Sequence, residues 1–183
     1  MCGIAGLIHK GKSSSVGSEM TAMLQALKHR GPDSTGYAVY GEPTEGDYIM
    51  RLKVAEAEDM DRGRGIHQVI KDRITEVETI LAEHGAKVKS KSAPREYSLR
   101  YVLTHSGDTG EMASHIEETE GVEILSMGNG LELIKDLGDA SVVSEAYGLN
   151  DFKGTHGIGH TRMATESDVD IKSAHPYWAF PYN

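Results

Sequence analysis

The chain contains one cysteine, and it is the second residue, in the opening Met1-Cys2-Gly3. Cysteine is small enough for Met1 to be removed, which would leave a thiol and a free α-amine on the same residue. Such an amine can take the proton from a side-chain nucleophile, as histidine does elsewhere. The reference pKa of an α-amine, about 7.7–8.0, lies close to that of a free thiol, about 8.5, so the transfer is nearly balanced. Cys2 is therefore a candidate nucleophile, and the alternative is a small, inert buried thiol.

A second group of reactive side chains lies near the end of the chain, in Gly159-His160-Thr161-Arg162-Met163-Ala164-Thr165. A guanidinium donates several hydrogen bonds at once and suits a carboxylate. If this stretch lies beside Cys2, Arg162 can hold the α-carboxylate of an amino-acid substrate, and Thr165 can add a hydroxyl contact. The alternative is an edge strand that carries an ordinary surface arginine.

A third group, His29-Arg30-Gly31-Pro32-Asp33-Ser34, places an arginine and an aspartate among small or rigid residues. An arginine such as Arg30 can hold a carboxylate or backbone carbonyls through several donors at once. The alternative is simply the end of a helix and a turn, where glycine, proline and aspartate are common.

Composition excludes several classes of function. The chain has 19 basic and 28 acidic residues and a formal net charge of −9, which argues against binding nucleic acid. No apolar run approaches the roughly 20 residues that span a bilayer, and no secretory signal is visible, so we expect a cytoplasmic protein without membrane contact. His156 and His160 are four residues apart, but Gly157 and Gly159 disfavour the helix that would bring them together, so we expect no metal site.

The elements that must position these residues alternate between strands and helices. We expect a buried strand over 3–9, a helix over 18–29 with Ser18 as N-cap, and strands over 35–40 and 47–54. In the middle of the chain, the pattern predicts helices over 66–85 and 110–120 and a short helix over 131–137. It predicts strands over 87–91, 97–104 and 122–126, with Pro94 in the turn between the first two strands. A strand that leads into a functional loop follows over 155–165.

Taken together and in this order, the three groups and the later Ala174-His175-Pro176 resemble the class II glutamine amidotransferases. The resemblance covers residues 2–55 and 154–183, and treats 57–138 as a small α/β insertion in a domain that spans 2–183. Within the family, the form Arg-Met-Ala-Thr-Glu-Ser over 162–167 is most similar to stand-alone glutaminase subunits related to glutamate synthase and N-methylglutamate synthase. The implied fold is α+β, the α-β-β-α sandwich of the N-terminal-nucleophile (Ntn) hydrolases, incomplete in this chain.

The resemblance implies a reaction and roles for matching residues. Cys2 would attack the side-chain amide of glutamine, its amine would pass the proton to the leaving ammonia, and water would hydrolyse the glutamyl thioester. Arg162 would bind the substrate carboxylate with Thr165 beside it. The residues implied to support the site are Arg30, Gly31, Asp33, His160 and His175. The family needs no cofactor for this reaction, and the ammonia would pass to a synthase partner.

The family pattern continues beyond this chain. An Asn-Gly pair that forms the oxyanion hole, and an aspartate that binds the substrate amine, are expected after the His175-Pro176 segment, and the chain reaches Asn183 before either. We therefore expect a fragment of a longer chain, or a second polypeptide that supplies the rest. The alternative function is a non-catalytic regulatory or assembly subunit that keeps the fold.

Overall fold

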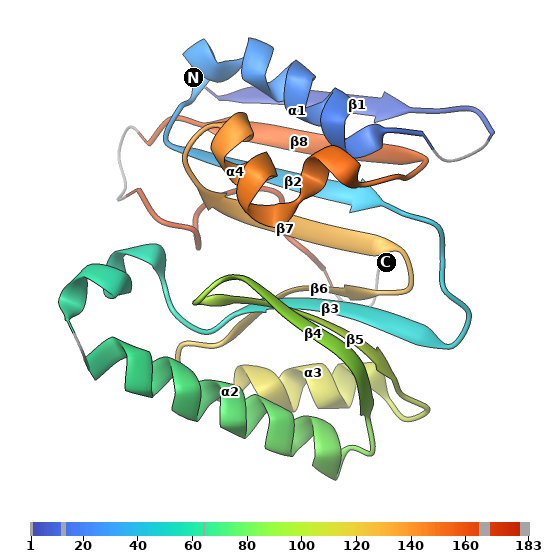
Figure 1. Cartoon of the computed structure of the whole chain (residues 1–183), viewed down its shortest axis with the longest axis vertical. Coiled ribbons are helices and arrows are strands. Elements are labelled where there is room, and N and C mark those ends of the chain that lie inside the picture. The colour runs from blue at the N-terminus through green and yellow to red at the C-terminus, as the bar shows by residue number, and fades with distance from the viewer. Residues whose placement is uncertain (1, 12–13, 64, 165–168, 180–183) are drawn as a thin grey trace. The chain divides into compact units, whose positions relative to one another are not determined.

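The computed structural model describes residues 2–11, 14–63, 65–164 and 169–179 (Figure 1). The chain divides into two compact units. The first unit comprises Met1–Pro43 and Gly130–Tyr177, and the second comprises Thr44–Asn129 and Trp178–Asn183. Among its described residues, each unit contains a four-stranded antiparallel sheet and two α-helices, which confirms the expected α+β class. The insertion proposed over 57–138 stays a prediction.

The sheet of the first unit has the strand order β1 (Gly3–Ile8), β8 (His156–Arg162), β2 (Ser34–Tyr40) and β7 (Leu131–Leu137). Helices α1 (Val16–Ala26) and α4 (Ala140–Tyr147) pack on one face of this sheet (Figure 1). Two short 3-10 helices, η1 (Lys28–Arg30) and η3 (Leu149–Asp151), complete the described elements of this unit. Segments from both ends of the chain therefore meet in one sheet, with β8 between β1 and β2.

The core of the first unit lies between the sheet and its two helices. Tyr37 on β2 is fully buried there, and its hydroxyl donates a hydrogen bond to the carbonyl of Ala140 on α4 at 2.9 Å. Burial raises the pKa of Tyr37 to about 12. The other buried members of this core are Ala5, Val16, Met20, Leu24, Val39, Ile134, Ala140, Val143 and Leu149. The core thus joins β1, β2 and β7 to both helices.

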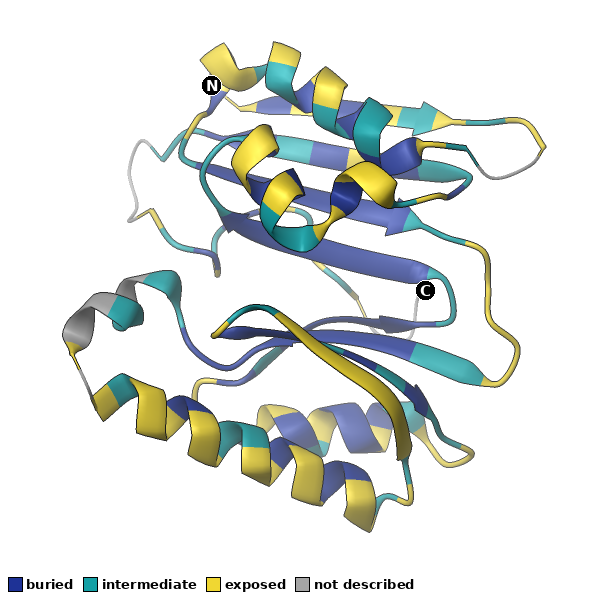
Figure 2. Cartoon of the chain, viewed as in Figure 1, coloured by how far each residue is buried: buried dark blue, intermediate teal, exposed yellow. Residues whose placement is uncertain are grey.

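The sheet of the second unit has the order β4 (Lys87–Arg95), β5 (Ser98–Thr104), β3 (Asp47–Lys53) and β6 (Glu123–Gly128). Its helices are α2 (Gly65–Glu83) and α3 (Thr109–Glu117), and the 3-10 helix η2 (Ala57–Arg62) precedes α2. The pattern of α2 is amphipathic: its buried residues are Ile70, Val77, Ile80 and Leu81, while much of the helix surface is exposed (Figure 2). No helix among the described residues is long and apolar enough to cross a membrane.

Three details of the predicted elements are wrong. Residues 131–137 form β7 rather than a helix, because they pair with β2 along its full length, from Leu131 opposite Tyr40 to Leu137 opposite Ser34. Ser18 is not the N-cap, since α1 begins at Val16 after Ser15. Pro94 lies within β4 instead of in a turn. An outer strand tolerates proline because one of its edges makes no ladder hydrogen bonds.

Helix α4 was not predicted, although its start carries a clear signal. The carboxylate of Asp139 accepts hydrogen bonds from the backbone N–H groups of Ser141 and Val142, the arrangement of an N-cap. Lys28 lies 2.6 Å from the same carboxylate, and this contact, with the hydrogen bonds, holds the pKa of Asp139 well below its usual range. Gly148 ends the helix in the left-handed conformation.

Candidate functional site

The sheet of the first unit presents two different faces. Gly157, Gly159 and Thr161 on β8 point toward α1, and a side chain added at Gly159 would lie within 3 Å of Met20. Strand alternation turns the intervening Ile158, His160 and Arg162 to the opposite side. We call this the second face, and it also carries Ile4 on β1, Gly36 on β2 and Lys135 on β7.

The register places Cys2 and Arg162 together on the second face. Gly3 is opposite Thr161 in the antiparallel pair of β1 and β8, so the next position along each strand sets Cys2 opposite Arg162. Directly opposed residues of such a pair have Cα atoms about 4.5–5.5 Å apart. Cys2 is exposed, unlike an inert buried thiol. The register therefore makes the backbone positions of Cys2 and Arg162, predicted from two distant sequence groups, neighbours across the two strands.

The position of Arg162 differs from that of an ordinary surface arginine. Strand β8 is an inner strand, and Arg162 is 7% exposed. Gly3 allows this close pairing, because a Cβ at that position would lie 2.8 Å from the hydroxyl oxygen of Thr161. Glycine after Cys2 thus has a packing reason that sequence reasoning did not identify.

The loop after η1 holds the end of β8. The backbone N–H of Asp33 donates to the carbonyl of Arg162 at 3.1 Å, and its carboxylate accepts from the N–H of Ala164 at 2.7 Å. Gly31 lies against the same peptide, since a Cβ there would overlap the carbonyl carbon of Arg162 and lie 2.7 Å from the N–H nitrogen of Met163. Gly31 and Asp33 therefore fix the backbone on both sides of the Arg162 carbonyl.

The structure also brings His160 and His175 into contact. Their ring centroids are 5.0 Å apart in an edge-to-face arrangement. Burial lowers the pKa of His160 below its ordinary 6.5, and the nearby His175 and Arg162 lower this pKa further. His160 is therefore neutral in the folded chain at neutral pH, and the buried Arg162 supplies positive charge on this part of the second face.

The lowered pKa of His160 predicts a pH-dependent stability. Below pH 6.5 the unfolded chain binds a proton at His160 that the folded chain does not bind, so the free energy of unfolding falls as pH decreases. The contribution of His160 to the free energy of unfolding is fully present above pH 6.5. It is lost as the pH falls from 6.5 to the lower pKa of His160 in the folded chain, and over this range the free energy of unfolding changes by up to about 1.4 kcal/mol per pH unit. We expect His160→Gln to flatten this slope in urea titrations, whereas His29→Gln, at an exposed position of the same unit, leaves it unchanged. An unaltered slope in His160→Gln contradicts the assignment.

Two predicted residues are not placed at the site by the structure. Arg30 is exposed at the end of η1. Thr165 lies outside the described residues. The residues that sequence reasoning missed are Gly3, Gly36, Lys135, Ala164 and Tyr177. Gly3 and Ala164 stand within the sequence groups named above, and Gly36 and Tyr177 stand close to one, whereas Lys135 belongs to none of them.

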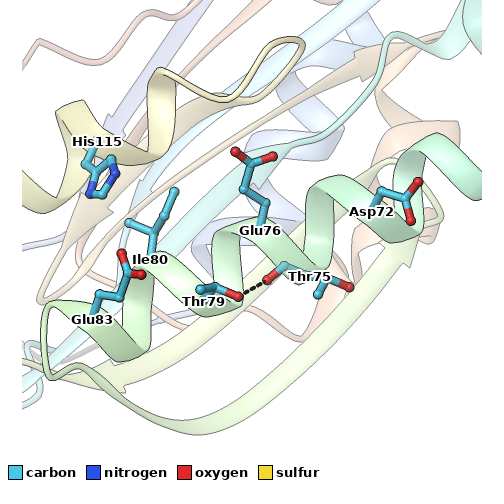
Figure 3. A pocket seen from close by; sticks show the side chains of 7 residues that line it. All are labelled: Asp72, Thr75, Glu76, Thr79, Ile80, Glu83 and His115. Atoms are coloured by element: carbon cyan, nitrogen blue, oxygen red, sulfur yellow. Dashed lines mark hydrogen bonds between the residues drawn. The ribbon is translucent and has the colours of Figure 1, made fainter.

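Neither of two surface hollows is lined by Cys2 or Arg162. In the second unit, a hollow of about 500 Å³ between α2 and α3 is lined by Asp72, Thr75, Glu76, Thr79, Ile80, Glu83 and His115 (Figure 3). The Thr79 hydroxyl in this hollow donates to the carbonyl of Thr75 at 2.8 Å. In the first unit, a hollow of about 530 Å³ lies at the other end of β1 from Cys2, beside the stacked rings of Tyr40 and His156. Among the described residues, no group of three or more His, Cys, Asp and Glu side chains is arranged to hold a metal ion.

Comparison with known proteins gives relatives over nearly the whole chain. A putative glutamine amidotransferase of Methanothermobacter thermautotrophicus is 36% identical over 183 residues, which is 98% of this chain and 57% of the relative. The glutamine amidotransferase-like protein GlxB of Rhizobium meliloti is 31% identical over 179 residues, which is 97% of this chain and 54% of the relative. These relatives support a glutamine amidotransferase family for the chain. No family model matches it.

A shorter match is to a third protein whose name also includes glutamine. Glutamine–fructose-6-phosphate aminotransferase (isomerizing) of Pyrobaculum aerophilum is 35% identical over 60 residues, which is 33% of this chain and 10% of the relative. The chain spans about half the length of the two amidotransferase relatives that it matches almost from end to end.

Proposed function

We propose that the chain is the nucleophile-bearing part of a class II glutamine amidotransferase with the Ntn fold. It hydrolyses glutamine to glutamate and ammonia through a thioester on Cys2, and the ammonia passes to a synthase partner in the cytoplasm. The observation that carries the proposal is the register of β1 and β8, which sets Cys2 opposite the buried Arg162. The names of the relatives support glutamine as the substrate.

The proposed reaction begins once Met1 is removed. The Cys2 sulfur attacks the carbon of the side-chain amide while the terminal amine takes the thiol proton. A carbon–sulfur bond forms, the carbon–nitrogen bond breaks, and the proton leaves with the nitrogen as ammonia. Water then adds to the thioester, the carbon–sulfur bond breaks, and glutamate departs with the thiol restored.

Arg162 has the position to select the substrate. A guanidinium pairs with a carboxylate through two parallel hydrogen bonds, which fixes orientation as well as charge. Asp33 and Gly31 hold the peptide that follows Arg162, so the side chain extends from a rigid backbone. An amino acid whose α-carboxylate binds Arg162 can direct its side-chain amide toward Cys2. Free glutamine then fits better than a glutamine within a polypeptide, which lacks that carboxylate.

A covalent label tests the assignment directly. The Met1-processed chain is incubated with the diazoketone analogue of glutamine and analysed by intact mass and peptide mapping. We expect one adduct, on Cys2, that excess glutamine suppresses. Arg162→Ala should slow the labelling and make it insensitive to glutamine, because the carboxylate contact is lost. Lys91→Met in the second unit serves as the control and should label like the parent.

Two results would contradict the proposal. The first is a folded, Met1-processed chain that gains no adduct on Cys2. The second is retention of Met1 in the mature protein, because an extended terminus leaves no free amine on Cys2 to act as the base. Retained Met1 would instead favour the regulatory or assembly role.

A further inference from the structure

A second row of residues crosses the sheet directly beside the row that holds Cys2 and Arg162. His160 is opposite Ile4 on one side and Gly36 on the other, and Gly36 is opposite Lys135. Residues two positions apart on a strand share a face and lie about 7 Å apart. The row that contains His160 and Lys135 therefore borders the proposed amino-acid site.

Gly36 leaves a gap in this row, and a later segment of the chain occupies it. A Cβ at Gly36 would overlap the carbonyl oxygen of His175 and would lie 2.8 Å from its carbonyl carbon and 3.0 Å from Cδ of Pro176. The segment Ile171–Tyr177 thus lies in contact with the backbone of β2 on the second face. Its residues Ile171 and Ala174 are each 1% exposed, which shows that the segment is packed rather than loosely attached.

A continuous line of rings joins this segment to two members of the row, His160 and Lys135. The His175 ring packs against His160 at 5.0 Å and against the Tyr177 ring at 4.7 Å. At the other end, Nζ of Lys135 lies 4.7 Å from the centre of the Tyr177 ring and donates to the carbonyl of Lys172 at 3.5 Å. Lys135 is 2% exposed, and nothing in the proposed reaction uses it.

A buried ammonium is costly unless its surroundings compensate for lost water. The face of an aromatic ring and a backbone carbonyl both attract a cation, and here both come from the segment Ile171–Tyr177. The charge of Lys135 on β7 therefore favours the arrangement in which this segment lies across the sheet. In that arrangement His175 stands against His160, two residues from Arg162 on the same strand.

We propose that Lys135 is a positioning residue for the amino-acid site, which it shapes by holding the segment Ile171–Tyr177 across the second face so that His175 forms the wall beside Arg162. This inference rests on the proposed function. Lys135 touches neither the substrate nor Cys2 in this role. Its loss should therefore weaken glutamine binding and leave the thioester chemistry largely unchanged.

The test uses the complete chain and two independent readouts. Lys135→Met keeps the length of the side chain and removes its charge. We expect it to raise KM for glutamine by about three- to thirtyfold, the range that corresponds to a cation–π contact, with kcat within about twofold of the parent. Lys135→Arg, which keeps the cation over the ring, should restore most of the affinity. Lys91→Met is the matched control, because Lys91 also lies over a tyrosine ring, that of Tyr101 at 5.7 Å, but in the second unit.

The second readout does not depend on turnover. Trp178 is the single tryptophan of the chain and follows Tyr177 directly, so its emission reports on the end of the segment. We expect the emission to change in Lys135→Met and Gly36→Ala, and to stay unchanged in Lys91→Met and Gly6→Ala. Gly6 is on the second face as well, but a Cβ there meets its nearest neighbour at an ordinary 3.6 Å.

The outcomes separate this inference from the proposed function. A parent chain that does not hydrolyse glutamine contradicts the function. A parent that does, with equal KM values in Lys135→Met and Lys91→Met, contradicts the role of Lys135. Unchanged Trp178 emission in Lys135→Met contradicts that role whether or not the chain is active. Should Lys135→Met fail to fold, Tyr177→Leu removes the ring from an exposed position and is expected to raise KM and change the emission in the same way.

Discussion

Replacing Cys2 with serine is expected to reduce glutamine hydrolysis by at least about a thousandfold, because removal of a catalytic nucleophile is among the largest single effects known in enzymes. A serine hydroxyl is a far weaker nucleophile than a thiol at neutral pH. Cys2 is exposed and precedes β1, so the change touches no core contact. Steady-state ammonia release measures the effect, and circular dichroism checks the fold.

The same variant should retain its affinity for glutamine, since Arg162 and the loop that holds it are unchanged. Equilibrium binding of glutamine to Cys2→Ser, compared with Arg162→Ala, separates the two roles: the first binds without turnover, and the second binds weakly. Turnover of Cys2→Ser within tenfold of the parent would exclude Cys2 as the nucleophile. In that case the diazoketone adduct would also be expected elsewhere.

A single methyl group at Gly31 is expected to cause the second large effect. The added Cβ of Gly31→Ala would overlap the carbonyl carbon of Arg162 and lie 2.7 Å from the carbonyl oxygen. These are backbone atoms, so neither partner can rotate away, and overpacking of this kind typically costs about 1–3 kcal/mol of stability. The peptide that follows Arg162 must shift, so we expect a lower urea midpoint together with a KM for glutamine raised at least about tenfold.

Gly6→Ala is the matched control for this prediction. It also adds one methyl group to the first unit, where the nearest atom, the carbonyl oxygen of Gly157, is 3.6 Å away. We expect the control to keep the urea midpoint and the KM of the parent. If Gly31→Ala behaves like Gly6→Ala, the contact between Gly31 and the Arg162 peptide does not govern the site.

Prediction from the sequence succeeded where a signal is local. Strands β1, β2 and β3 and helices α2 and α3 occur within three residues of their expected positions, because glycine- and proline-rich stretches and a clear apolar period mark them. It failed for Leu131–Leu137, where seven residues suit either a short helix or a strand. Pairing with β2, almost a hundred positions earlier in the chain, selects the strand. Helix α4 was missed although Asp139 caps it.

For the candidate site too, some features could be predicted from the local sequence and others depended on tertiary contacts. The sequence by itself determined which side chains have the chemistry: a thiol that can share a residue with an amine, an arginine in a glycine-rich strand, and an aspartate in a rigid turn. Only the tertiary structure decided that Cys2 lies opposite Arg162 and that Asp33 binds the backbone of Ala164, because register and loop contacts join positions more than a hundred residues apart. Lys135 shows the limit most clearly. The sequence around Lys135 gives no sign of a role at the site, because its contacts with Tyr177 and with the carbonyl of Lys172 exist only once the segment Ile171–Tyr177 lies over β7.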